Sequence, residues 1–270
     1  MKVSVEQIKG VLSYIFNLSI NTGDVPENMK VAKVVPVYKS GDKNKIENYR
    51  PISILPAFSK LLEKIVFKQV NAFLSKHNVF YKHQYGFRSR HSTVHPVMHL
   101  IKSITEANNK SSKDVTLAIF LDLSKAFDTL SHEILLQKLD HYGIRGVCNQ
   151  WFRSYLSGRI QYVDFCGSKS EYTSIKSGVP QGSILGPLLF LVYINDLHCS
   201  TSTNLLSFAD DTTLYQSSNN LVSLYFHINN ELKNVSNWLS ANKLSLNISK
   251  TKYMIFSSNT RLNIPPNLLL

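Results

Sequence analysis

The sequence predicts an α+β fold, in which a four-stranded antiparallel sheet of the split βαβ kind is backed by helices. Three observations lead to this prediction. A near-continuous apolar run at 115–121 is typical of a strand buried on both faces. Two short strand-forming runs flank Asp210 and Asp211, which indicates a tight β-hairpin with both aspartates at its bend. A last strand at 253–256 follows a long helix, so the buried strand can pair with the hairpin and leave the helices on the sheet faces.

Composition narrows the class of protein. The chain has 270 residues, 43% of them hydrophobic, which is enough for one large domain or two lobes. Its net charge of +12 favours a polyanionic partner such as nucleic acid, although a merely basic protein is the alternative. The cysteines, Cys148, Cys166 and Cys199, lie too far apart for a zinc knuckle or a disulfide framework and indicate a reducing compartment. The longest apolar run, 187–194, is too short to span a bilayer, so we expect no membrane segment.

The first half of the chain alternates helices with extended segments. In order, we expect a helix at 3–20, strands at 31–39 and 49–55, a helix at 57–77 whose apolar stripe is core, a basic aromatic loop at 85–90 and a helix at 92–107. Lys33, Lys39 and Arg50 either share one basic surface or are solvated side chains on an edge strand. In the loop, Phe87, Arg88 and Arg90 are suited to stacking on bases and holding phosphates.

The second half begins with the buried strand, which ends in Asp122. After it we expect helices at 131–142 and 149–156, a hairpin of 161–165 with 172–175 joined by a turn at 167–170, a glycine-rich loop at 177–187 opening an apolar helix to 197, the Asp-Asp hairpin, and a helix at 219–240. The glycines allow a flat ligand to approach the backbone of the loop, although a plain strand-to-helix connection explains them equally well.

The aspartates point to metal chemistry. Adjacent carboxylates repel each other and are costly to desolvate beside apolar strands unless a cation compensates them. Hard oxygen ligands favour Mg²⁺ or Mn²⁺, whereas an exposed turn without function is the alternative. If the buried strand pairs with the hairpin, Asp122 lies beside Asp210, and such carboxylates can hold two metal ions roughly 3.5–4 Å apart for in-line phosphoryl transfer.

Six segments together carry a family resemblance. They are Asn48–Leu55, Gln84–Arg88, Phe120–Asp128, Gly178–Pro187, Phe208–Asp211 and Asn247–Thr251. In this order the set closely resembles the reverse transcriptase domain of non-LTR (LINE-type) retrotransposons, over roughly residues 25–257. The resemblance implies the fingers and palm of a right-hand polymerase. It places a helical extension at 1–24, fingers mainly at 25–113, a palm at 114–257 with a fingers-side insertion around 130–175, and a disordered tail at 258–270.

The resemblance also implies roles for individual residues. Asp122 and Asp210 would coordinate two Mg²⁺ ions, with Asp211 completing the acidic cluster and the Leu123 carbonyl facing a metal. Phe127 would exclude a ribose 2′-OH, and Gln181 and Gly182 would line the nucleotide and template base. Lys39 and Arg50 would hold the triphosphate. Lys250 would protonate the leaving pyrophosphate.

The implied function is RNA-directed DNA polymerisation on an RNA template with a DNA primer and dNTPs, in the nucleus. A thumb should follow residue 257, where about a dozen residues remain, so we expect it to be absent or truncated and synthesis to be weak and distributive or absent. The alternative function is a catalytically silent nucleic-acid-binding module, truncated or domesticated, whose binding is indifferent to replacement of the aspartates.

Overall fold

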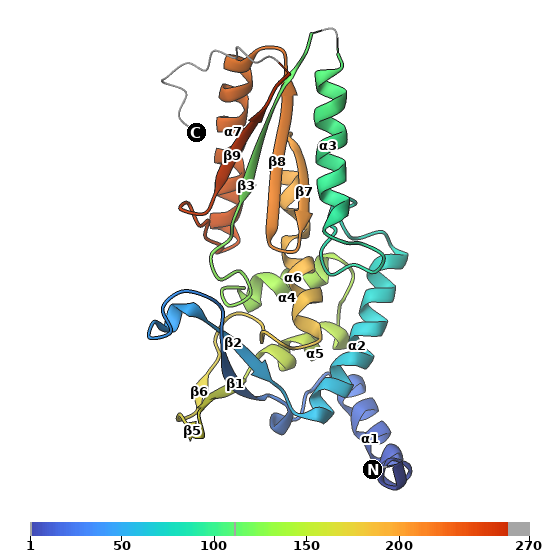
Figure 1. Ribbon diagram of the computed structural model, residues 1–270. Coiled ribbons are helices and arrows are strands. Elements are labelled where there is room, and N and C mark those ends of the chain that lie inside the picture. Colours follow the sequence, from blue (N-terminus) through green and yellow to red (C-terminus); the bar gives the residue numbers. More distant parts are fainter. Residues whose placement is uncertain (1, 111, 259–270) are drawn as a thin grey trace. The chain divides into compact units, whose positions relative to one another are not determined.

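The computed structural model describes residues 2–110 and 112–258, and its helices and strands follow the predicted order (Figure 1). The chain divides into two compact units. Unit 1 comprises Met1–Val79 and Phe127–Tyr193, and unit 2 comprises Phe80–Ala126 and Ile194–Leu270. Within the described residues, no helix has both the length and the apolar character needed to cross a membrane.

Unit 1 is a mixed sheet surrounded by helices. Its elements are α1 (Lys2–Thr22), β1 (Val31–Tyr38), β2 (Tyr49–Ile54), α2 (Ala57–Lys76), α4 (His132–His141), α5 (Val147–Leu156), β4 (Ile160–Phe165), β5 (Ser168–Lys169), β6 (Thr173–Ser174) and α6 (Leu185–Ile194), with short 3₁₀ turns at Glu27–Met29 and Ile46–Asn48. The strand order is β2-β1-β4-β5, and β6 also pairs with β4. β1 runs antiparallel to β2 and parallel to β4.

Two details of unit 1 differ from the prediction. The predicted turn at 167–170 contains β5, which pairs with β4 after a bend at Cys166 and Gly167, because both of those residues adopt positive φ and reverse the chain at once. In α2 only part of the apolar stripe is core, so the prediction for the whole stripe was wrong. Leu62, Val66 and Leu74 are buried, whereas Phe58, Leu61, Ile65 and Phe73 are 37–47% exposed, because the stripe is wider than the face on which α2 packs.

Unit 2 contains the predicted four-stranded antiparallel sheet, which is confirmed. Its elements are α3 (Val94–Asn108), β3 (Val115–Leu121), β7 (Asn204–Phe208), β8 (Asp211–Ser218), α7 (Leu221–Ala241) and β9 (Lys252–Phe256), with a 3₁₀ helix at Asn195–Ser200. The strand order is β7-β8-β3-β9. β3 pairs on both edges, with β8 and with β9, and its side chains are buried on both faces, which explains its near-continuous apolar sequence.

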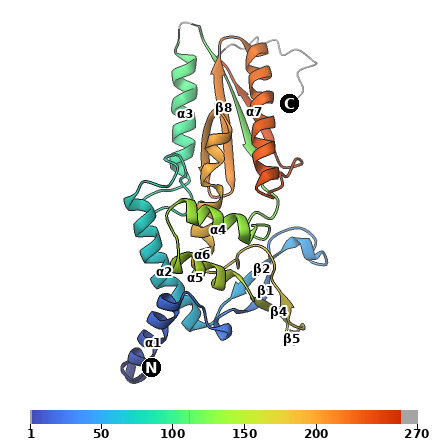
Figure 2. The same cartoon turned by 180° about the vertical axis from the view of Figure 1, so that it is seen from behind.

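Helices cover the sheet of unit 2. Ala118, Leu206 and Tyr215 form a buried cluster against which Leu100 of α3 packs. α7 lies behind the sheet in Figure 1 and in front of it in Figure 2, and it buries an apolar face that includes Leu224.

The predicted domain boundaries rest on the family resemblance and stay predictions. The boundary between fingers and palm at 113/114 does not coincide with a unit boundary, since residues 80–113 cluster with the antiparallel sheet. Most of the predicted disordered tail, at 259–270, lies outside the described residues.

Candidate active site

Strand register brings two of the predicted aspartates together. In the β3–β8 ladder Leu121 pairs with Thr212, so the next residue, Asp122, stands opposite Asp211 at the start of β8. In the hairpin, Phe208 pairs with Asp211, which leaves Ala209 and Asp210 as a two-residue bend. The predicted bend contained both aspartates, whereas Asp211 is already a strand residue. Directly opposed residues of an antiparallel pair project from the same face, so the carboxylates of Asp122 and Asp211 share one side of the sheet.

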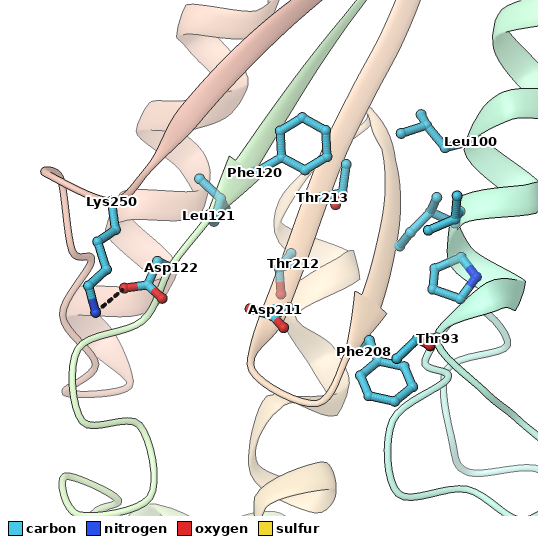
Figure 3. Close-up of a pocket in the computed structure, with 13 residues that line it drawn as sticks. Thr93, Leu100, Phe120, Leu121, Asp122, Phe208, Asp211, Thr212, Thr213 and Lys250 are labelled. Atoms are coloured by element: carbon cyan, nitrogen blue, oxygen red, sulfur yellow. Dashed lines mark ion pairs between the residues drawn. The ribbon is translucent and has the colours of Figure 1, made fainter. Parts of the chain in front are cut away.

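The carboxylates interact through their charges. Partial desolvation, and then the negative charges of Asp210 and Asp122, raise the pKa of Asp211. Lys250 lies on the other side of Asp122, with its Nζ 3.8 Å from the carboxylate Oδ2 (Figure 3). The Lys250 side chain is 62% exposed, so water screens this pair and it offsets only part of the repulsion.

Backbone hydrogen bonds fix the position of Lys250. The Asp122 carbonyl accepts from Asn247 N (2.7 Å), and Ser124 N donates to the Ser245 carbonyl (2.8 Å). Between these bonds Leu123 forms an antiparallel bridge with Leu246. In such a pair the backbone groups of Leu123 point away from the 245–247 segment, so its carbonyl is available on the other side, as a metal ligand requires. Its role as a ligand stays a prediction.

The donor set of this cluster fits a hard divalent cation. Carboxylate and carbonyl oxygens are the ligands preferred by Mg²⁺, and a cation would relieve the repulsion that raises the pKa of Asp211. As the side chains of the described residues stand, no three carboxylate, imidazole or thiol groups surround one point closely enough to enclose an ion. The Asp122 side chain is paired with Lys250 through Oδ2.

A groove opens beside the acids within unit 2. It is a cavity of about 410 Å³ between α3 and the sheet, with Asp122, Asp211 and Lys250 among its lining residues. Figure 3 shows apolar side chains along its wall, among them Phe120 and Leu100. The acids therefore stand at an accessible surface rather than in a closed core.

The predicted phosphate-binding residues lie in unit 1. Lys39 N donates to the Asn48 carbonyl (2.8 Å), and Arg50 pairs with Val37, so Lys39 and Arg50 project from the same face of the β1–β2 ladder. Both side chains are exposed. Lys33 is also on β1, but its Nζ forms an ion pair with Asp164 Oδ2 (2.8 Å). Of the three residues of the predicted basic surface, Lys33 is therefore paired with a carboxylate, whereas Lys39 and Arg50 are exposed.

The glycine-rich loop lies against β2. The Gln181 carbonyl accepts from Ser53 N (2.6 Å), and a Cβ added to Gly182 would stand 2.6 Å from the Ser53 carbonyl oxygen. Gly182 has φ +112°, so both its conformation and its contact require glycine. A cavity of about 350 Å³ beside this contact is lined by Gln181 and also by Gln161, which the sequence did not single out.

Phe127 is attached to the same loop. Its carbonyl accepts from Val179 N (2.9 Å), and its ring stacks on Phe190 with centroids 4.7 Å apart. Unit 1 therefore contains Lys39, Arg50, Phe127, Gln181 and Gly182, with Gln181 and Gly182 in contact with β2 and Phe127 bonded to the glycine-rich loop. Their role as a nucleotide site stays a prediction.

The basic aromatic loop of unit 2 divides into supporting and exposed residues. Arg88 Nη1 donates to the carbonyls of Tyr81 (3.2 Å) and Gln84 (3.3 Å), and its guanidinium lies over the Phe80 ring. Arg88 thus shapes the loop. Phe87 is 51% exposed and Arg90 is exposed, and both stay candidates for contacts to nucleic acid.

Sequence reasoning missed several buried polar residues next to the predicted site. Gln84 and Glu63 are 4% and 1% exposed, and both hydrogen-bond to loops that carry site residues. Glu63 carried a signal that was available, because it is a single charge within an apolar helical stripe. Gln84 belonged to a segment that contributed to the family resemblance, and the sequence assigned it no role of its own.

Comparisons with known proteins identify the family and the fold of this chain. A family model described as reverse transcriptase (RNA-dependent DNA polymerase) matches residues 39–263. A probable RNA-directed DNA polymerase from transposon BS of Drosophila melanogaster is 32% identical over 264 residues, covering 92% of this chain and 28% of that protein. The RNA-directed DNA polymerase from mobile element jockey of the same organism is 27% identical over 267 residues, covering 94% of this chain and 28% of that protein.

More distant similarities extend this result. A Pol polyprotein from a type-1 retrotransposable element R2 of Popillia japonica is 26% identical, over 92% of this chain and 35% of that protein. The chain thus spans 28–35% of the length of these three relatives. A telomerase structure from Candida albicans shares the fold, with a TM-score of 0.63 over 89% of this chain and 44% of that one at 13% identity. The resemblance to non-LTR retrotransposon enzymes is confirmed, and the chain belongs to the reverse transcriptase (RNA-dependent DNA polymerase) family.

Proposed function

We propose that this chain extends a DNA primer on an RNA template by adding dNTPs. The observation that carries the proposal is the meeting of Asp122 and Asp211 across β3 and β8, with Asp210 in the adjoining bend. Acidic residues far apart in sequence converge there at an exposed groove, and phosphoryl transfer is the chemistry that such a cluster serves in this family.

Reverse transcriptases generally use divalent metal ions. In this chain the ligands would be the carboxylates of Asp122, Asp210 and Asp211 with the Leu123 carbonyl, and Mg²⁺ or Mn²⁺ suits these oxygens. When bound, two such ions lower the pKa of the attacking primer 3′-OH and neutralise charge on the leaving phosphates. Lys250 gives a proton to the leaving pyrophosphate, and its ion pair with Asp122 supports this role.

The nucleotide is held by residues of unit 1. Lys39 and Arg50 project from one face of the β1–β2 ladder and bind the triphosphate through charge-assisted hydrogen bonds. The Phe127 ring, fixed by its stack on Phe190, lies under the sugar and excludes a 2′-OH. Gln181 and Gly182 contact the nucleotide and the template base, and Phe87 and Arg90 contact the template–primer.

The decisive experiment is Mg²⁺-dependent dTTP incorporation on a poly(rA)/oligo(dT) duplex. Wild type is compared with Asp210→Ala and with Asp140→Ala, a matched control whose carboxylate is exposed on α4. We expect incorporation by wild type and by Asp140→Ala and none by Asp210→Ala, with all three binding the duplex. Incorporation by Asp210→Ala at the wild-type rate would contradict the assignment. Binding by all three without incorporation by any would identify a silent binding module.

A further inference from the structure

We infer that Gln84 is a positioning residue of this active site, because its side-chain amide holds the bend of the β7–β8 hairpin and thereby the place of Asp210. The catalytic consequence rests on the proposed function. The structural part, an amide that grips the bend, stands on contacts within unit 2 alone.

Gln84 pairs with both backbone groups of one bend residue. Its side chain is buried, its Nε2 donates to the Ala209 carbonyl (3.3 Å), and its Oε1 accepts from Ala209 N (3.0 Å). The same Oε1 also accepts from Gly86 N (2.8 Å). A primary amide carries both a donor and an acceptor, so it can pair with a peptide unit as a neighbouring strand would.

Ala209 depends on such a partner. Its φ is +58°, a left-handed conformation that costs a residue with a Cβ roughly 1–2 kcal/mol. Ala209 is also buried, 5% exposed, so its N–H and C=O are costly to leave unpaired. Strained residues of this kind persist where surrounding contacts fix them, which is what the Gln84 amide does here.

The backbone next to Gln84 provides further support. Tyr85 N donates to the Ser207 carbonyl (2.8 Å) and Ser207 N to the His83 carbonyl (3.0 Å), so residues 83–85 bridge β7 in parallel. A Cβ added to Gly86 would lie 2.0 Å from Ala209 N, so only glycine permits this approach. The segment Gln84–Gly86 therefore forms a clamp on the hairpin from outside it.

Catalysis is sensitive to the position of this bend because Asp210 directly follows Ala209. A displacement of about 1 Å in a reacting constellation can lower the rate about 100-fold. The residues proposed to hold the dNTP belong to unit 1, whereas the contacts of the clamp all lie within unit 2. Loss of the Gln84 amide should therefore lower kcat and leave KM for dTTP nearly unchanged.

The test replaces Gln84 by methionine, which keeps the length of the side chain and removes the amide. The matched control is Thr116→Val, which removes a buried hydrogen bond to Ser217 from the same sheet but at the end of β3 away from Asp122. Two quantities are measured in both variants and in wild type. They are hydrogen exchange of the Ala209 amide by NMR, and kcat and KM for dTTP incorporation.

In Gln84→Met we expect the Ala209 amide to exchange about fivefold faster, since one hydrogen bond has a net value near 1 kcal/mol, and kcat to fall about 100-fold. Thr116→Val should match wild type in both quantities. If Gln84→Met does not fold, Gln84→Glu serves, because it can accept from Ala209 N but, when ionised, cannot donate to the Ala209 carbonyl. It should lower kcat while largely protecting the amide.

Unchanged Ala209 exchange in Gln84→Met overturns the clamp, whether or not the chain is a polymerase. Faster exchange with wild-type kcat overturns the positioning role. A wild type that incorporates no dTTP refutes the proposed function, and the exchange rates then decide the clamp alone.

Discussion

Replacing Glu63 by alanine should destabilise unit 1 by about 4 kcal/mol. Glu63 lies on α2 and is 1% exposed. Its Oε2 accepts from Ile184 N (2.7 Å) in the glycine-rich loop, and its Oε1 accepts from the Tyr155 hydroxyl (2.9 Å) of α5. One carboxylate therefore ties together a helix, a second helix and the loop that carries Gln181.

The magnitude follows from the groups that alanine leaves behind. The Ile184 N–H and the Tyr155 hydroxyl lose their acceptor, at about 1–3 kcal/mol each. Arg159 is 1% exposed, and its Nε and Nη2 have no hydrogen-bond partner among the described residues, so the nearby charge of Glu63 compensates it. Removing one member of a buried charged pair costs about 3–5 kcal/mol. These effects overlap, which gives about 4 kcal/mol rather than their sum.

Replacing Glu63 by glutamine separates the effect of its hydrogen bonds from the effect of its charge. Desolvation raises the pKa of Glu63, and its hydrogen bonds from Ile184 and Tyr155 and the charge of Arg159 oppose that rise. A raised pKa means that the folded state binds more protons than the unfolded state, so stability falls as pH rises from 4.5 through the folded pKa. Glu63→Gln keeps one acceptor and one donor and should lose this pH dependence.

Urea unfolding followed by tryptophan fluorescence measures these effects. Trp151 is buried in unit 1, and a Trp238→Phe background leaves it as the single reporter. Tyr155→Phe is the matched control, because it removes one of the two hydrogen bonds and should cost about 1 kcal/mol. A free energy of unfolding for Glu63→Ala within about 1 kcal/mol of wild type would refute the inferred role of the carboxylate.

Three further outcomes are expected. Asp211→Asn removes a charge that is repelled by Asp210 and Asp122, so it should raise the free energy of unfolding by about 0.5–1 kcal/mol. The same variant should abolish dTTP incorporation. A lower free energy of unfolding than wild type, measured in urea, would contradict this reasoning. Lys250→Met breaks an exposed ion pair and should change stability by less than about 1 kcal/mol, yet slow incorporation at least about 100-fold in single-turnover assays if Lys250 is the proton donor. Desolvation, and then two neighbouring tyrosines, raise the pKa of Tyr81 to about 12, so stability should fall as pH rises from 10.0 through that value. Tyr81→Phe should remove both this fall and one high-pH transition in the ultraviolet titration.

Much of the fold was predictable because the decisive signals are local. The run 115–121 is apolar at nearly every position, which predicted a strand buried on both faces, and nearly every residue of β3 is buried. The bend at Cys166 and Gly167 was misplaced because a two-residue turn there depends on Cys166 adopting φ +51°, which a cysteine rarely does. The outer half of the α2 stripe was assigned to the core because periodicity shows that a face is apolar and not what covers it.

For the site, the acidic residues could be identified from the sequence, but the residues that hold them in position could not. Asp122, Asp210 and Asp211 stand out because carboxylates at strand ends have few structural explanations. Gln84 lies far from Ala209 in sequence, and nothing in its own segment shows that its amide pairs with that bend. The ion pair of Lys250 with Asp122 likewise depends on the backbone bonds of Asn247, a long-range contact without a local signature.

Gln84 in unit 2 and Glu63 in unit 1 stabilise loops for the same physical reason. A loop that presents side chains to substrate cannot pair all of its backbone groups within a helix or sheet, and burial makes the unpaired groups costly. In unit 2 the buried Gln84 amide supplies the partner for Ala209, beside Asp210. In unit 1 the buried Glu63 carboxylate supplies it for Ile184, in the loop of Gln181. A substitution at either support should therefore affect the chemistry without touching substrate, the first through kcat and the second through stability of the loop.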